Sequence, residues 1–230
     1  MPVISFVSSK GGVGKSTAVL VLAAEFARAG AGRVTIIDAD PNQPIAAWAK
    51  LPNKPEAVSV IGGVTEDTVI DVIDAEAARA PFVLVDLEGT ASVIAAYAIS
   101  RSDLVVIPCQ GSHLDAREAS KAVRLIRRNE NAFKRKIPHA VLVNRCSAAF
   151  VTRGLKHILG EFERHAVPVL RTQLMEREAF KALFAIGGSL YELTLDDVRN
   201  PEAAQENAQA LAREVFHEAR SGVEQGSAAR

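Results

Sequence analysis

A glycine-rich loop between an apolar run and a helical stretch constrains this chain more than any other feature. The run "VISFV" (3–7) is followed by "SSKGGVGKST" (8–17), and residues 16–29 are rich in alanine and leucine up to Gly30. In a strand–loop–helix of this kind, the N–H groups of the loop and of the helix N-terminus face a phosphate group. The stretch therefore predicts a phosphate-binding loop in a parallel α/β fold.

The rest of the chain repeats this alternation of strand and helix. Short, continuous runs rich in Val and Ile are typical of parallel strands that are buried on both faces. They occupy residues 3–7, 33–38, 82–86, 103–108 and 139–144, with a shorter run at 57–61. Helical patterns occupy residues 16–29, 65–79, 114–130 and the stretch that follows Asn200. We therefore expect one doubly wound α/β domain over residues 1–220 with a mostly parallel sheet, and a frayed tail at 221–230.

Charge and cysteine content exclude several classes of protein. The 230 residues carry 27 basic and 27 acidic side chains, so bulk charge does not make the chain a binder of polyanions. Cys109 and Cys146 have no paired spacing, which argues against a disulfide framework or a zinc site. No signal peptide and no membrane-spanning stretch is recognisable. We expect a soluble, cytoplasmic protein.

Within the loop, each residue type suits one part of a nucleotide. Lys15 would reach the β- and γ-phosphates, Ser16 would place its hydroxyl on Mg²⁺, and Thr17 would bond the α-phosphate. The strict pattern G-x-x-x-x-G-K-[ST] needs glycine where this chain has Ser9. The backbone must still come close to the phosphates, and three glycines allow this: Gly11, Gly12 and Gly14.

The full string resembles the deviant phosphate loop of the ParA/MinD ATPases, "KGGxGK[ST]T", with Val13 at the variable position. The resemblance covers most of the chain and is strongest over 3–48 and 82–145. In size and layout it is closest to short ParA proteins of plasmid partition and their relatives in conjugative transfer. The resemblance implies that Lys10 reaches across a dimer interface to the phosphates bound by the partner subunit. A second cation near the γ-phosphate can offset charge that develops during hydrolysis.

Carboxylates end two of the predicted strands and would face the ligand crevice at the carboxyl edge of the sheet. Asp86 ends "FVLVD" (82–86), which is the geometry of a Walker B carboxylate directed at Mg²⁺. Asp38 and Asp40 lie in a "DxDP" stretch that resembles the first switch region of ParA-type ATPases. The resemblance implies that Asp40 orients or activates the attacking water. It implies that Asp38 helps to hold Mg²⁺ through water or shapes the loop. A plain polar turn is the alternative for both, and Glu88 receives no role.

An asparagine ends another predicted strand, "HAVLVN" (139–144). A side-chain amide offers one donor and one acceptor to the edge of a purine. The family commonly uses an N–R pair here, which in this chain is Asn144 and Arg145. We therefore assign Asn144 to adenine recognition, with a cap at the strand–loop junction as the alternative. Ser112 and Asp115 are better explained as caps of the following helix than as catalytic groups.

A basic segment, "RLIRRNENAFKRK" (124–136), is the candidate for contact with nucleic acid. A solvated surface is the alternative for any such run of charge. The resemblance implies non-specific DNA binding by an ATP-bound dimer, without the helix-turn-helix that serves operator-specific ParA proteins. The tail "SGVEQGSAAR" is not the basic amphipathic helix that a membrane-bound MinD-like protein needs. The basic residues of the segment are Arg124, Arg127, Arg128, Lys134, Arg135 and Lys136.

Together these features predict a Mg²⁺- and ATP-dependent, dimerising switch ATPase for DNA segregation. Its hydrolysis would be slow and stimulated by a ParB-like partner protein. A positioning ATPase for a conjugative-transfer complex or another protein cargo is the first alternative. A metabolic enzyme with the same loop is the second, although no set of polar groups for a small substrate is recognisable. An iron–sulfur relative of the nitrogenase iron protein is the third, and the distance in sequence from Asp86 to the cysteines disfavours it.

Overall fold

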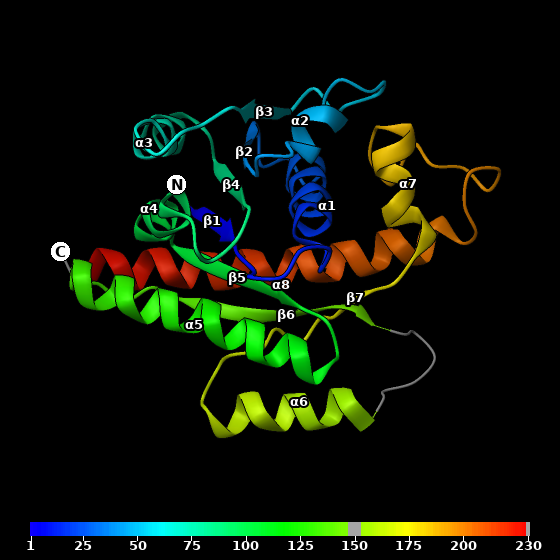
Figure 1. Cartoon of the computed structure of the whole chain (residues 1–230). Helices are drawn as coiled ribbons and strands as arrows, with labels where there is room; N and C mark the ends of the chain where they lie inside the picture. The colour runs from blue at the N-terminus through cyan, green and yellow to red at the C-terminus, as the bar shows by residue number, and fades with distance from the viewer. Residues whose placement is uncertain (147–152, 229–230) are drawn as a thin grey trace.

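The fold is built on one parallel sheet. The computed structural model describes residues 1–146 and 153–228 (Figure 1). Seven strands lie in the order β3-β2-β4-β1-β5-β6-β7, and their pairings are parallel. All six runs predicted as strands are confirmed, and so is the doubly wound α/β class. The strands are β1 Val3–Phe6, β2 Val34–Ala39, β3 Val58–Gly62, β4 Phe82–Leu87, β5 Leu104–Cys109, β6 His139–Cys146 and β7 Leu174–Met175.

The central strands are continuously apolar because both of their faces are covered. Every residue of β1, β2, β4 and β5 is buried. β1 lies between β4 and β5, and Ile4 is paired with Leu84 on one side and Leu104 on the other. β3, at one edge of the sheet, is mostly half-buried.

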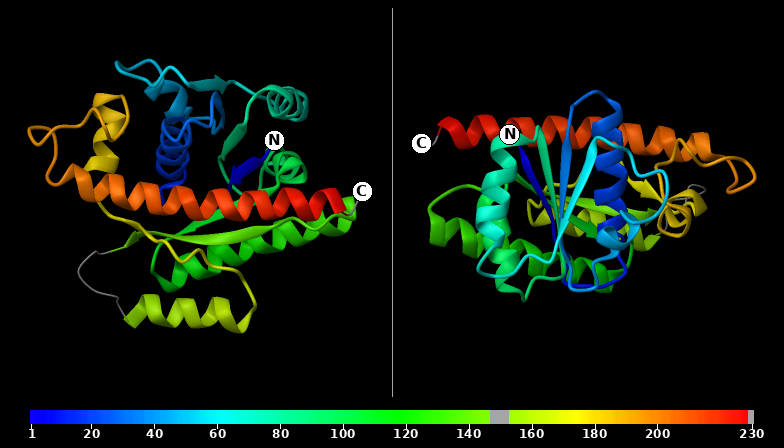
Figure 2. Two further views of the ribbon diagram at one scale, coloured as in Figure 1. Left: turned by 180° about the vertical axis from the view of Figure 1, so that it is seen from behind. Right: turned by 90° about the horizontal axis from the view of Figure 1, so that it is seen from above.

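Helices cover both faces of the sheet (Figures 1 and 2). One hydrophobic core joins α1, α2, α7 and α8 to one face, and a second joins α3, α4, α5 and α6 to the other. Figure 2 shows α8 running past α1 along the length of the molecule. The helices are α1 Lys15–Arg28, α2 Pro44–Trp48, α3 Val69–Arg79, α4 Val93–Arg101, α5 His113–Phe133, α6 Arg153–Arg164, α7 Glu178–Ile186 and α8 Pro201–Ala228.

The order of the strands places a ligand crevice at the end of β1. The chain leaves β1 through α1 to reach β2 and β3 on one side, returns to β4, and then adds β5, β6 and β7 on the other side. The parallel register brings Phe6 and Asp38 level with Asp86. Open α/β sheets bind ligands outside the carboxyl ends of the strands where the order reverses. The glycine-rich loop therefore opens at the position that this rule selects.

The end of the chain, expected from the sequence to be a frayed tail, continues as helix α8 to Ala228, and its flexibility stays a prediction. A Cβ atom built on Gly222 would come within 2.2 Å of the Asp103 carbonyl oxygen, so the helix packs closely on the start of β5. The small residues of the segment allow this contact, although their polarity suggested a free end. Within the described residues, no helix is both long and apolar enough to cross a membrane.

Candidate nucleotide site

The loop between β1 and α1 depends on glycine for its shape. Gly12 and Gly14 have positive φ angles of 73° and 91°, a region that favours glycine. A Cβ atom on Gly14 would lie 2.3 Å from Asn144 Nδ2. Val13 is buried beneath the loop, and α1 begins at Lys15. The loop therefore leads directly into the N-terminus of α1.

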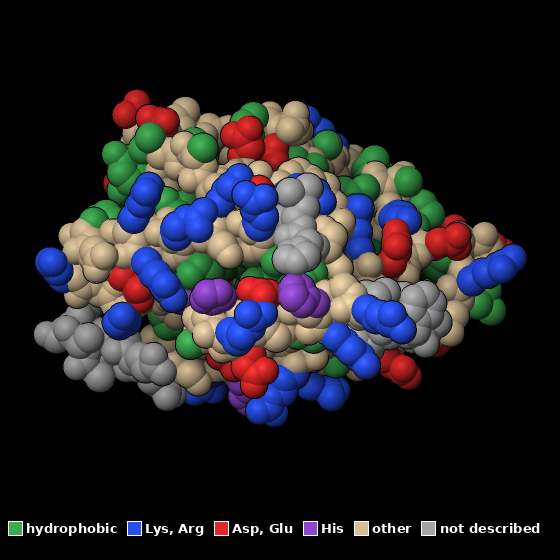
Figure 3. Space-filling view, turned by 60° about the horizontal axis from the view of Figure 1, so that its bottom comes forward, with side chains coloured by type: hydrophobic (Ala, Val, Ile, Leu, Met, Phe, Trp, Pro, Cys, Tyr) green, Lys and Arg blue, Asp and Glu red, His purple; other side chains and the backbone are tan. Residues whose placement is uncertain are grey.

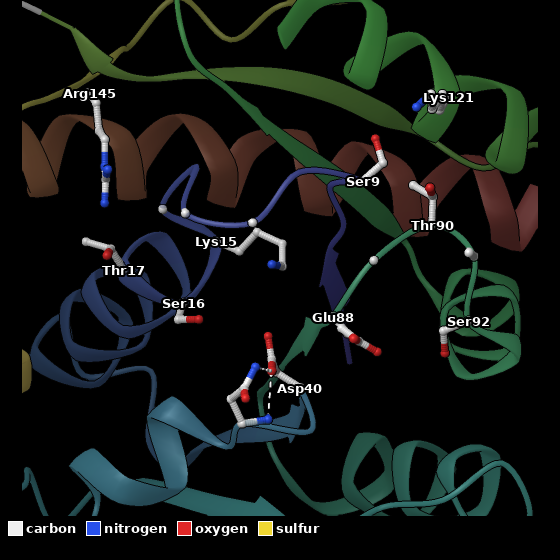
Figure 4. Close-up of a pocket in the computed structure, with 16 residues that line it drawn as sticks. Ser9, Lys15, Ser16, Thr17, Asp40, Glu88, Thr90, Ser92, Lys121 and Arg145 are labelled. Atoms are coloured by element: carbon white, nitrogen blue, oxygen red, sulfur yellow. Dashed lines mark hydrogen bonds between the residues drawn. The ribbon is translucent and has the colours of Figure 1, made fainter. Parts of the chain in front are cut away.

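A cavity of about 890 Å³ opens over this loop. This volume lies within the range of small-molecule sites, which is about 300–1,000 Å³. Figure 4 shows side chains from the loop, from the ends of β2 and β4, from α5 and from the end of β6 around it. The predicted residues that line it are Gly11, Gly12, Gly14, Lys15, Ser16, Thr17 and Asp40.

Asp86 lies fully buried behind the cavity, at the carboxyl end of β4. Neither of its carboxylate oxygens has a hydrogen-bond partner among the described residues. Burial raises the pKa of Asp86 to about 7, although the nearby Ser16 hydroxyl and Lys15 ammonium oppose the rise. The Ser16 hydroxyl lies close without meeting hydrogen-bond geometry. An ionised Asp86 therefore needs a cation that the protein itself supplies only in part.

Asp38, at the end of β2, is held by backbone N–H groups of the following segment. Its Oδ2 accepts hydrogen bonds from the backbone N–H groups of Ile45 (2.9 Å) and Ala46 (2.8 Å), and its Oδ1 accepts one from Asp40 N–H (3.4 Å). Burial raises the pKa of Asp38, and these three bonds oppose the rise. Asp38 does not line the cavity. The structure supports the loop-shaping alternative, because this carboxylate fixes the chain between β2 and α2.

Asp40 projects into the cavity from the loop after β2 (Figure 4). Its Oδ1 accepts hydrogen bonds from the backbone N–H (2.9 Å) and the side-chain Nδ2 (3.1 Å) of Asn42. No hydrogen bond from a described residue engages Oδ2 of Asp40. Glu88 lines the same cavity, because Ala39 and Leu87, the residues before each carboxylate, are paired between β2 and β4. The sequence analysis left Glu88 without a role.

Asn144 is turned toward the loop. It is 2% exposed, and its Nδ2 donates to the carbonyl oxygens of Val13 (2.8 Å) and Gly14 (3.2 Å). Its Oδ1 accepts a hydrogen bond from Arg145 N–H. Both amide hydrogens hold the loop in this structure, and the contact of Asn144 with adenine stays a prediction. Arg145, at a φ of 54°, lines the cavity instead.

Ser9 explains how the loop tolerates the loss of a glycine. Its hydroxyl donates to Glu118 on α5, with a distance of 2.5 Å to Oε2 and 3.1 Å to the carbonyl oxygen. Glu118 also pairs with Lys121, whose Nζ lies 2.7 Å from Oε1. Lys121 and Ser9 both line the cavity. Sequence reasoning missed Glu118 and Lys121, because no local pattern reveals that α5 passes beside the loop.

Lys10 stands apart from the other loop residues. It is half-buried, its backbone N–H donates to Ser8 Oγ (3.3 Å), and it is absent from the cavity lining that includes its neighbours Ser9 and Gly11. One copy of the chain thus brings Lys15, but not Lys10, to its own cavity.

The predicted basic segment is only partly available for contact. Arg135 donates to the Ser102 carbonyl oxygen, and Lys136 lies 3.8 Å from Glu130. Arg124, Arg127, Arg128, Lys134 and Lys136 are exposed. Figure 3 shows Lys and Arg side chains gathered on the face of the molecule where α5 and α6 lie.

Helical spacing extends this surface toward the nucleotide site. Exposed basic residues recur along α5 at intervals of four, three and four positions, which places them on one face of the helix. We call these residues the α5 stripe: Arg117, Lys121, Arg124 and Arg128. Lys121 belongs both to the stripe and to the cavity lining. Sequence reasoning found the second half of the stripe and missed the first half.

Comparison with known proteins agrees with this geometry. The family model described as VirC1 protein matches residues 1–218. Protein ParA of Rhizobium radiobacter is 38% identical over 216 residues, which cover 94% of this chain and 96% of that protein. The cell division ATPase MinD of Pyrococcus furiosus has a TM-score of 0.73 at 17% identity, covering 94% of this chain and 98% of that one. The septum site-determining protein MinD of Pyrococcus horikoshii, solved with Mg-ADP, has a TM-score of 0.70 at 15% identity, with 93% and 95% covered.

Proposed function

This chain belongs to the VirC1 family, within the ParA/MinD group of partition and positioning ATPases, and on that premise we propose an ATP-dependent switch that dimerises and binds DNA without sequence preference. The observation that carries the proposal is a glycine-rich loop that lines a cavity, with a fully buried carboxylate, Asp86, behind it that has no hydrogen-bond partner among the described residues. Hydrolysis serves to reset the switch, and a ParB-like partner protein accelerates it. Residues 1–220 act as one domain, and the protein works in the cytoplasm.

The residues present fit Mg²⁺ and ATP. Mg²⁺ is usually held by one or two carboxylates together with phosphate oxygens and water. Asp86 and the Ser16 hydroxyl would hold the ion, which would neutralise phosphate charge when bound. Among the described residues, no group of three or more His, Cys, Asp or Glu side chains is placed to hold a metal.

Three side chains divide the work at the cavity. Lys15, 6% exposed at the start of α1, places its ammonium group against the phosphates. Asp40 uses the carboxylate oxygen that Asn42 leaves unengaged to accept a hydrogen bond from the attacking water. Asn144 keeps the loop in position, because its amide bridges two loop carbonyls.

Dimerisation would bring Lys10 to a nucleotide site. Lys10 lies at the loop and outside the cavity of its own subunit. We place it in the partner's cavity, where its positive charge adds to that of Lys15 and offsets charge that develops in the transition state. Nucleotide state and dimerisation are then coupled, because each subunit completes the site of the other.

The α5 stripe is the DNA-contacting surface in this proposal, joined by Arg127 and Lys134. Four basic residues along one helix face span about 16 Å, at 1.5 Å per residue. Lysine and arginine bind phosphates and release counterions, so affinity falls as salt concentration rises. A dimer carries two stripes, and their weak contacts add through effective concentration.

Binding to random-sequence duplex DNA tests the function directly. We expect binding with ATP, weak binding with ADP or without nucleotide, and a loss of affinity across a salt series. Arg124→Glu combined with Arg128→Glu should abolish binding and leave ATP binding intact, whereas Arg199→Glu, an exposed charge reversal outside the stripe, should have little effect. Absence of DNA binding at low salt would refute this reading and favour a positioning ATPase for a protein cargo.

Two loop variants separate nucleotide binding from the action of Lys10 at the partner subunit's site. Lys15→Ala should lose ATP binding. Lys10→Ala should keep ATP binding and lose ATP-driven dimerisation or hydrolysis, measured by light scattering and phosphate release. Normal hydrolysis by Lys10→Ala would show that Lys10 does not act in the partner subunit's cavity. Asp40→Ala should accumulate as an ATP-bound dimer.

A further inference from the structure

A second cavity, of about 340 Å³, lies between α1 and α8. It is bounded by the C-terminal end of α1, by Phe82 at the start of β4 and by the middle of α8. The nucleotide loop adjoins the opposite ends of α1 and β4. Since α1 has 14 residues, the two cavities are about 20 Å apart. The second cavity is therefore spatially separate from the nucleotide site.

Aromatic rings form one wall of this cavity. Phe26 and Phe82 are stacked, with their ring centroids 4.6 Å apart and their planes at 24°. Phe216 of α8 continues the group, 5.8 Å from Phe82, and is only half-buried. Offset stacking of another ring on such a wall is favourable beyond the burial of its surface. Phe26 and Phe82 are only 3% and 5% exposed, so Phe216 offers most of the accessible ring surface, and the Arg220 guanidinium lies 5.6 Å from its ring centroid.

The rim of the cavity carries net positive charge. Its charged lining residues are Glu25, Arg28 and Arg213, with His217 beside them. Glu25 is 3% exposed, and its carboxylate is already engaged by Tyr191 Oη (2.8 Å) and Arg28 Nε (3.2 Å). Arg213 is exposed, and no described side chain forms an ion pair with it.

The C-terminal end of a helix carries a partial negative charge, which opposes an anion nearby. At α1, Arg28 lies in the last turn, and the N–H groups of Ala29, Gly30 and Ala31 already bond the final carbonyl oxygens. The negative end of α1 is thus largely satisfied. Arg213 remains as the group that can pair with an anion, and His217 stands edge-on to Phe216 at 5.7 Å.

We propose that this cavity binds a small aromatic carboxylate, whose ring lies on the wall of Phe26, Phe82 and Phe216 and whose carboxylate pairs with Arg213. The volume of the cavity suits one ring system of about a dozen non-hydrogen atoms. Arginine pairs with a carboxylate through two parallel N–H···O bonds, which fixes the direction of the ligand as well as its charge.

Titration of the full-length protein with 2-naphthoate, followed by ligand fluorescence and calorimetry, tests this site. We expect one-to-one binding with a Kd of about 1 mM or below, the scale that ordinary ligand efficiency gives for a ligand of this size. The neutral analogue 2-naphthamide should bind at least about tenfold more weakly, because it lacks the charge that Arg213 recognises. Saturating ATP should leave naphthoate binding unchanged, since the two cavities are separate.

Variants assign the binding to this cavity. Arg213→Glu should weaken 2-naphthoate binding at least about tenfold and leave the weak amide binding unchanged, because it reverses the charge on the rim. Phe216→Ala should weaken both ligands by removing part of the wall. Arg199→Glu, an exposed charge reversal elsewhere, serves as the matched control. Thermal unfolding confirms that each variant is folded, and Arg213 is exposed, so its variant is expected to fold.

Several results would overturn the proposal. They are an absence of saturable binding, equal binding of the amide, displacement of naphthoate by ATP, or full affinity in the folded Arg213→Glu protein. Each of these would mean that the cavity is not a site for aromatic carboxylates.

Discussion

Replacing Asp86 with asparagine should remove a loss of stability that the nucleotide-free protein suffers as pH rises. The pKa of Asp86 rises from 3.8 to about 7 in the folded chain because the carboxylate is fully buried without hydrogen-bond partners. A difference of about three pKa units corresponds to about 4 kcal/mol, at 1.36 kcal/mol per unit. The ionised Asp86 carboxylate therefore lowers the free energy of unfolding by about 4 kcal/mol.

The sign of the pH dependence follows from proton binding. Between the two pKa values, the folded state holds a proton on Asp86 that the unfolded state has released. The free energy of unfolding therefore falls as pH rises from about 4 to about 7, and it levels off above the folded pKa. From pH 5 to pH 8.5, Asp86 should remove about 3 kcal/mol of stability.

Urea unfolding without nucleotide or Mg²⁺, at pH 5 and pH 8.5, measures this effect. The stability of Asp86→Asn relative to the unmodified protein should increase by about 3 kcal/mol between the two pH values. Comparing differences removes the constant cost of burying the amide. Asp67→Asn, an exposed carboxylate, should show almost no pH-dependent difference. Mg²⁺ with ATP should stabilise the unmodified protein and have little effect on Asp86→Asn.

A pH-independent difference between Asp86→Asn and the unmodified protein would refute this reasoning. It would mean that Asp86 is ionised at ordinary cost in the folded protein. The argument for a cation at this position would then lose its main support.

Three other substitutions test how the loop is held. Gly14→Ala should cost at least about 2 kcal/mol, from strain at a φ of 91° and from the clash with Asn144, as measured by urea unfolding, and should lose binding of a fluorescent ATP analogue. Asn144→Ala should lower the free energy of unfolding by about 1–3 kcal/mol and should also lower the affinity for ATP. The preference for ATP over GTP should not change. A change in that preference alone would support the contact of Asn144 with adenine. Ser9→Ala should cost about 1–2 kcal/mol and weaken ATP binding by calorimetry, because the loop loses its bond to Glu118. Unchanged stability and affinity in Ser9→Ala would mean that this bond does not hold the loop.

The sequence was sufficient for the features that depend on local patterns. Continuous apolar runs identified six of the seven strands, because parallel strands covered on both faces need apolar residues throughout. The glycine-rich loop identified the candidate phosphate site, because glycine adopts the positive φ angles found at positions 12 and 14 most readily. β7 was missed because a strand of two residues carries no periodic pattern.

The tertiary structure decided how polar side chains are used. Three polar residues stand at strand ends in the sequence but are used differently. Asp38 accepts hydrogen bonds from the first turn of α2, Asp86 has no hydrogen-bond partner among the described residues, and Asn144 holds the loop. Their roles depend on which backbone groups neighbouring elements bring within about 3 Å, and sequence spacing contains no such information. The bond from Ser9 to Glu118, the joining of the α5 stripe to the nucleotide cavity and the aromatic wall beside Arg213 likewise arise only when distant segments pack together.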